Sequence, residues 1–116
     1  MQKPNVIQEK SYGFSLHIIE FCNVLNERRQ YVLSKQLLKS GTSIGANIEE
    51  ALQAQSRRDF IAKLSISLKE AFETKYWLRL IRDSKTASLQ EMGALFSEID
   101  EILKLLISII KTSKAT

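Results

Sequence analysis

The stretch LQEMGALFSEIDEILKLLISIIKT, residues 89–112, carries the most regular hydrophobic pattern in the chain. Its apolar side chains recur at alternating spacings of four and three residues, as in a helix that buries one face along a heptad seam. The members of this seam are Met92, Phe96, Ile99, Leu103, Leu106 and Ile110. The pattern predicts one continuous amphipathic helix over residues 89–112.

Helical periodicity also marks three earlier segments, over residues 13–27, 31–55 and 57–83. Ser56 followed by Asp59 resembles a capping box at the start of the third segment. The apolar positions are Phe14, Ile18, Phe21 and Leu25 in the first segment, Leu33, Leu37, Ile44, Ile48 and Leu52 in the second, and Phe60, Leu64, Leu68, Ala71, Phe72 and Leu78 in the third. Each segment is long enough to bury one apolar face against the others.

The connections between these four helices are short, which favours antiparallel neighbours. The sequence therefore predicts an all-α fold, an antiparallel up-down-up-down four-helix bundle in a single domain over residues 1–116. We expect frayed ends over about residues 1–12 and 112–116, where the periodic pattern stops.

Composition excludes several other classes of protein. The 116 residues include four Gly and one Pro, too few for a collagen-like, low-complexity or turn-rich all-β chain. Cys22 is the single cysteine, so no internal disulfide forms, and its place beside the first apolar stripe predicts a buried, unreactive thiol. The chain has neither a signal-peptide core nor an apolar run of about 20 residues. A soluble cytoplasmic protein with no membrane contact is expected.

The sequence offers little machinery for catalysis. His17 is the only histidine and lies three residues before Glu20. Metal sites in carboxylate bundles need Glu-x-x-His on two helices and further Glu residues, and no second copy exists here. His17 is therefore interpreted as a surface or partly packed residue. We expect no enzyme, no cofactor and no metal site.

Small residues interrupt the second helix. Gly41 and Gly45 each cost a helix interior about 1 kcal/mol relative to Ala. Close approach of another helix would offset that cost, and a local bend is the alternative. Ser40 and Asn47 lie on the same flank, and we expect Asn47 to form a hydrogen bond with another helix that fixes the packing register.

Apolar side chains of the last helix cover an arc of about 200°, whereas one buried stripe needs little more than 100°. Trp77 and Ile66 add an apolar surface on the third helix. We therefore predict a homo-oligomer interface, and packing against two bundle neighbours is the alternative. The predicted interface residues are Trp77, Leu95, Ile102, Leu105 and Ile109.

Charge is concentrated in one segment. The net charge is +4, and residues 56–83 contain seven basic and four acidic residues. Lys75, Arg79 and Arg82 share one side of the third helix near its end, and Arg57 and Arg58 lie at its start. These five residues are predicted to contact nucleic-acid phosphates, with a solvated helix face as the alternative.

Two blocks of sequence resemble a known family. They are SGTSIGANIEEA, residues 40–51, and SRRDFIAKLSISLKEAFETKYWLRLI, residues 56–81. They are similar to the four-helix-bundle proteins encoded within 23S rRNA intervening sequences, over about residues 10–110. This resemblance implies a left-handed antiparallel bundle, a ring-like homopentamer and no catalytic residues. The chain is also similar to the accessory proteins of diversity-generating retroelements, basic pentamers that bind nucleic acid and a reverse transcriptase.

Together these features predict a non-catalytic homo-oligomer that binds RNA or DNA through phosphate contacts. A structural or scaffolding oligomer that binds another protein is the alternative, with the basic residues serving solubility.

Overall fold

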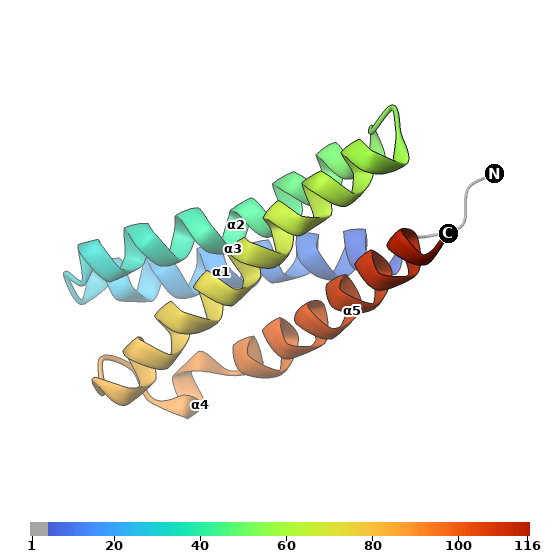
Figure 1. The fold of residues 1–116 in the computed structure, drawn as a ribbon. Coiled ribbons are helices and arrows are strands. Elements are labelled where there is room, and N and C mark those ends of the chain that lie inside the picture. The colour runs from blue at the N-terminus through green and yellow to red at the C-terminus, as the bar shows by residue number, and fades with distance from the viewer. Residues whose placement is uncertain (1–4) are drawn as a thin grey trace.

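The computed structural model describes residues 5–116, which form five helices (Figure 1). They are α1 (Val6–Glu27), α2 (Tyr31–Leu52), α3 (Arg57–Asp83), α4 (Leu89–Met92) and α5 (Leu95–Ala115). The four long helices pack side by side with alternating direction, α2 against α1 and α3, and α5 against α3 and α1. The described residues contain no strand. The all-α bundle is confirmed.

α1 begins at Val6, earlier than the expected start at residue 13. Asn5 caps it, because the Asn5 side chain accepts a hydrogen bond of 3.0 Å from the backbone amide of Gln8. Ile7 and Ser11 are buried and extend the stripe of Phe14 toward the start of the helix. The expected fraying is therefore wrong for residues 5–12, and residues 1–4 lie outside the described part of the chain. Ser11 concealed the pattern because it is a buried polar residue at an apolar position.

The predicted last helix is divided by Gly93, which adopts a φ of +57°. The preceding turn, α4, carries a complete capping box between Ser88 and Glu91. After the break, α5 continues to Ala115, so the expected fraying from residue 112 is also wrong. α2 ends at Leu52 rather than at residue 55.

The core lies between the four long helices and consists of the predicted apolar stripes with a few additions. The largest fully buried side chains are Phe14, Ile18, Leu25, Leu37, Ile44, Ile48, Leu64, Leu78, Ile81, Met92, Ile99 and Ile102. Phe72 was expected in the apolar stripe of the third helix, but 53% of its surface is exposed, so that expectation is wrong. It stands about 100° around the helix from the buried Ala71 and faces away from the core.

α1 packs tightly against α2 at Gly41. A Cβ atom on Gly41 would lie 3.0 Å from two side-chain carbons of Ile18, which is itself fully buried. At Gly45 the nearest atom would be the Ser15 hydroxyl at 3.4 Å, an ordinary van der Waals distance. The tight contact therefore belongs to Gly41.

Asn47 does not form the hydrogen bond to another helix that was expected of it, and Ser40 also bonds within its own helix. The Asn47 amide donates to the carbonyl of Ser43 in its own helix at 2.8 Å, because the side chain turns back along α2. The buried Ser40 hydroxyl donates to Leu37, also within α2, at 3.4 Å. The expected bond from Asn47 to another helix is thus corrected.

Hydrogen bonds between helices come from other small polar residues. The buried Ser67 hydroxyl of α3 donates to the Ile44 carbonyl of α2 at 2.8 Å. Between α1 and α2, the Ser34 hydroxyl donates to the Cys22 carbonyl at 3.2 Å, and the Cys22 thiol donates to the Ser34 carbonyl at 3.5 Å. Burial raises the pKa of the Cys22 thiol and disfavours the reactive thiolate.

None of the helices among residues 5–116 is both long and apolar enough to cross a membrane.

Candidate functional site

The five basic residues singled out from the sequence occupy opposite ends of α3. Arg57 and Arg58 form its first turn, whereas Lys75, Arg79 and Arg82 lie in its last third. A helix rises 1.5 Å per residue, so Arg58 and Arg79 are about 32 Å apart along α3. The structure therefore divides the predicted phosphate-binding set into two separate groups.

Two residues of the second group are engaged by carboxylates. Lys75 Nζ lies 2.6 Å from Asp100 Oδ1 and joins α3 to α5. Arg82 Nε donates to Asp83 at 2.7 Å, a hydrogen bond that raises the pKa of Arg82 and lowers that of Asp83. The Arg82 guanidinium also stacks 5.0 Å from the centre of the Phe96 ring. The charges of Lys75 and Arg82 are thus partly balanced inside the subunit.

Arg57 and Arg58 belong to a basic end of the bundle. Together with Lys114 from the last turn of α5, they line a shallow hollow. None of these three side chains forms an ion pair within residues 5–116. The segments 51–58 and 102–116 contain five basic residues and no Asp or Glu. Sequence reasoning missed Lys114, although the absence of acidic residues after Glu101 was a signal for it.

The predicted oligomer interface is largely internal. Leu95 is 3% exposed and Ile102 is 1% exposed, so both belong to the core of the subunit. Trp77, Leu105 and Ile109 are half-buried and pack against that core. The interpretation of Leu95 and Ile102 as interface residues is corrected, because α5 contacts both α3 and α1 and needs a wide apolar arc for two neighbours.

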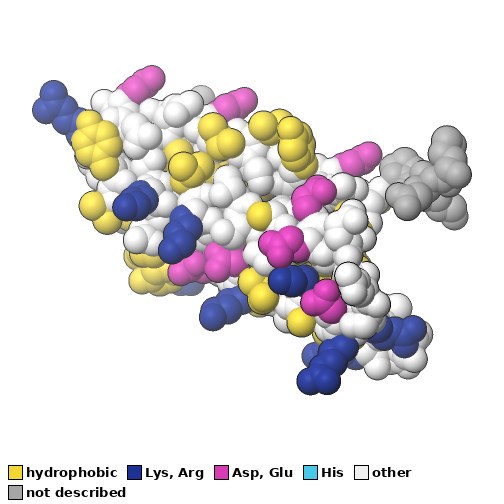
Figure 2. Space-filling view, turned by 90° about the horizontal axis from the view of Figure 1, so that it is seen from above, with side chains coloured by type: hydrophobic (Ala, Val, Ile, Leu, Met, Phe, Trp, Pro, Cys, Tyr) yellow, Lys and Arg dark blue, Asp and Glu magenta, His cyan; other side chains and the backbone are white. Residues whose placement is uncertain are grey.

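Two other groups of large apolar side chains are exposed. The first, called the α1/α2 patch, comprises Tyr12, Leu16 and Ile19 of α1 and Leu38 of α2, with exposures of 64%, 47%, 43% and 38%. It borders a hollow between α1 and α2, whose floor includes Gly45. Figure 2 shows one face of the molecule, where hydrophobic groups lie among scattered charges of both signs. Exposed apolar side chains in a group, as in the α1/α2 patch, are typical of surfaces that contact another protein chain.

The second group, called the α3 patch, comprises Phe72, Tyr76 and Leu80, which recur every four residues on the outer side of α3. Trp77 lies beside it, with its ring edge-on to Tyr76 at 5.3 Å between centroids. The Trp77 indole nitrogen is buried and has no hydrogen-bond partner within residues 5–116. Trp77 thus connects the α3 patch, through Tyr76, to the core against which it packs.

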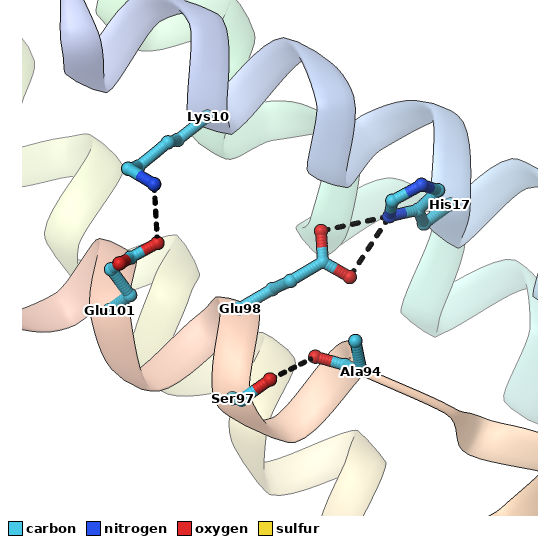
Figure 3. A network of polar contacts seen from close by, with 6 residues as sticks. All are labelled: Lys10, His17, Ala94, Ser97, Glu98 and Glu101. Carbon is cyan, nitrogen blue, oxygen red and sulfur yellow. Dashed lines mark hydrogen bonds and ion pairs between the residues drawn. The ribbon is translucent and has the colours of Figure 1, made fainter.

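His17 is a surface residue that links α1 to α5. Its Nδ1 atom lies 2.8 Å from the Glu98 carboxylate, and Lys10, earlier in α1, pairs with Glu101 at 2.7 Å (Figure 3). Glu20 and Glu91 line the same hollow as His17, but Glu91 pairs with Arg28. No group of three metal-binding side chains occurs within residues 5–116. The pairs made by His17 and Lys10 hold α1 against α5.

The fold and its surfaces define a class: a small antiparallel helical bundle with a basic end and exposed apolar patches. The chain belongs to the 23S rRNA-intervening sequence protein family, whose model matches residues 3–108. A similar solved structure is that of a protein with unknown function from the S23 ribosomal protein family of Bacteroides thetaiotaomicron. It is 50% identical in sequence, with a TM-score of 0.86, over 90% of this chain and 98% of that chain. None of the curated proteins matches the chain.

Proposed function

We propose that this protein is a non-catalytic homo-oligomer of the cytoplasm that associates with RNA or DNA through the phosphate backbone. The observation that carries this proposal is the basic end, where Arg57, Arg58 and Lys114 share one hollow without a carboxylate partner among the described residues. Membership of the 23S rRNA-intervening sequence family supports an RNA context. Phosphate contacts do not read the base sequence, so binding of this kind depends on charge and salt.

The assembly that we propose is a head-to-tail ring. Each subunit offers two different apolar surfaces, the α1/α2 patch and the α3 patch, and a ring forms when one of them packs on the other in the next subunit. Five subunits is the number implied by the family resemblance. A ring repeats the basic end in every subunit, so weak phosphate contacts combine into avidity on one polyanion.

The ring makes a complementation test possible. Leu16→Glu damages only the α1/α2 patch and Tyr76→Glu only the α3 patch, and both side chains are about half exposed in the subunit. Each variant alone is expected to be monomeric by light scattering, because every interface needs both patches. An equimolar mixture should form dimers, since each variant retains the surface that the other lacks.

Ile107→Glu is the matched control for that test, because Ile107 is 47% exposed but lies on α5, outside both patches. It should assemble like the unmodified protein. An unmodified protein that is monomeric at high micromolar concentration would refute the oligomer. A mixture that stays monomeric would refute head-to-tail packing of these two patches.

Reversing both Arg57 and Arg58 to Glu is expected to abolish most binding to a labelled RNA hairpin or DNA duplex at about 50 mM salt. Fluorescence anisotropy measures the affinity, and on duplex DNA the slope of log affinity against log salt should fall by about 0.9 for each phosphate that the variant no longer neutralises. The double reversal Arg29→Glu with Lys85→Glu makes the same change in net charge at the other end of the bundle and should have a smaller effect. Absence of binding by the unmodified protein, or equal losses of affinity in both double variants, would count against the proposal.

A scaffold that binds another protein is the second candidate function, favoured by the exposed α1/α2 and α3 patches. The resemblance to retroelement accessory proteins makes a reverse transcriptase one class of partner to test. A ring that forms normally but fails to bind RNA or DNA at low salt would favour the scaffold.

A further inference from the structure

An apolar cavity of about 290 Å³ lies between the four long helices, near the end where α1 begins. Each long helix contributes two apolar residues to its lining, among them Leu105 and Ile109 of α5. Asn5 is the one polar residue among the described residues of the lining, and its side-chain oxygen already accepts the hydrogen bond that caps α1. This oxygen is therefore already hydrogen-bonded, and the other described residues of the cavity wall are apolar.

Several large side chains around this cavity are left only half-buried. Leu52, Phe60, Leu105 and Ile109 all line it and are packed on the core from one side. Apolar cavities do not hold ordered water, because water there lacks hydrogen-bond partners. An apolar occupant would therefore remove exposed hydrocarbon from water without displacing a polar network.

A second hollow, with both polar and apolar residues in its lining, adjoins the cavity. Leu52 and Phe60 line both spaces, and the second space also contains Arg57 and the hydroxyl-bearing residues Thr112 and Ser113. Arg57 has no ion-pair partner within residues 5–116. The apolar cavity thus adjoins a hollow lined by Arg57, whose planar guanidinium suits a carboxylate.

We propose that this site binds a free anionic amphiphile, a single-chain carboxylate of medium length, with its alkyl chain in the cavity and its carboxylate at Arg57. The joined arrangement of apolar lining and unpaired guanidinium matches the two halves of such a molecule. This binding goes beyond the proposed association with nucleic acid and does not depend on it.

Titration calorimetry with hexanoate, octanoate and decanoate below their micelle concentrations tests the cavity. The affinity is expected to rise about fourfold for each added methylene group until the chain fills the available space. Nonyltrimethylammonium has the same nine-carbon alkyl chain as decanoate with a positive head and should bind at least tenfold more weakly. Failure of decanoate to saturate the protein at millimolar concentration, or equal binding of the cationic analogue, would overturn the proposal.

Paired variants locate the two ends of the ligand. Leu105→Phe fills the cavity and should weaken decanoate binding at least tenfold, whereas Ile107→Phe on the exposed side of α5 should not change it. Arg57→Glu should weaken binding more than Arg58→Glu, since Arg58 does not line the hollow that joins the cavity. Circular dichroism checks that each variant folds, and Ile109→Phe replaces Leu105→Phe if that variant does not.

Equal decanoate affinities in Leu105→Phe and Ile107→Phe, both folded, would overturn binding in the cavity. Equal losses of affinity in the Arg57→Glu and Arg58→Glu variants would overturn the placement of the carboxylate. Vesicles of phosphatidylglycerol separate a free ligand from a lipid surface: sedimentation with these vesicles, together with no binding of free decanoate, would replace the cavity site by a membrane-surface interaction. The expected result is decanoate binding without sedimentation.

Discussion

Replacing Ile102 by glutamate is expected to unfold the subunit rather than separate subunits from one another. Ile102 is 1% exposed and lies in the core of the bundle. Deleting a buried isoleucine side chain commonly costs about 2–5 kcal/mol, and a carboxyl group without a partner adds a further penalty. That loss approaches the whole stability of a small domain, about 5–15 kcal/mol. Urea unfolding followed by circular dichroism should show little or no helical baseline for this variant.

Ile107→Glu provides the control on the same helix. Ile107 is 47% exposed, so its replacement disturbs little packing and should change the free energy of unfolding by no more than about 0.5 kcal/mol. The two variants introduce the same side chain on the same helix, and only burial separates them. An Ile102→Glu variant that unfolds at the same urea concentration as the unmodified protein would show that this residue faces outward.

The contrast between Ile102 and Ile107 shows which structural features a hydrophobic pattern predicts and which it does not. Periodicity correctly predicted that residues 95–110 are helical and that one side of them is buried. It did not reveal how many neighbours the helix has. A helix with two neighbours in its own subunit and a helix with one neighbour and an external partner both show a wide apolar arc, so Leu95 and Ile102 were placed in the wrong interface.

Helix boundaries failed for a different reason, because they depend on single residues. Asn5 begins α1 by capping it, and Gly93 ends α4 by adopting a positive φ. Both residue types also occur inside helices or loops without such roles. Periodicity therefore located the long helices well and their ends poorly.

Charge pairing was the least predictable feature of the candidate site. Lys75 and Asp100 are 25 residues apart, and His17 and Glu98 are 81 residues apart, so their contacts exist only after the helices pack. Sequence alone assigned Lys75 and Arg82 to phosphate binding with the same weight as Arg57 and Arg58. The folded subunit distinguishes them, because Lys75 and Arg82 form ion pairs within residues 5–116 whereas Arg57 and Arg58 form none.

Substitutions at the two glycines of α2 are expected to have opposite effects on stability. At Gly41 a new Cβ would lie 3.0 Å from Ile18 Cγ1 and Cγ2, and Ile18 is fully buried, so a large side chain has to displace it. Gly41→Leu should therefore lower the free energy of unfolding by at least about 1–3 kcal/mol through overpacking. At Gly45 the nearest atom would be 3.4 Å away, so Gly45→Ala should raise the stability by up to about 1 kcal/mol through helix propensity.

Urea denaturation of both variants measures these shifts, and Gly41→Ala tests the same contact with the smallest possible side chain. Alanine gains the same helix propensity at both positions, so the difference between Gly41→Ala and Gly45→Ala isolates the contact with Ile18. A higher urea midpoint for both alanine variants, by similar amounts, would mean that Ile18 yields readily and that α1 and α2 do not need a glycine at position 41. A lower midpoint at Gly41 alone would show that the tight contact with Ile18 explains why α2 retains a residue that weakens a helix.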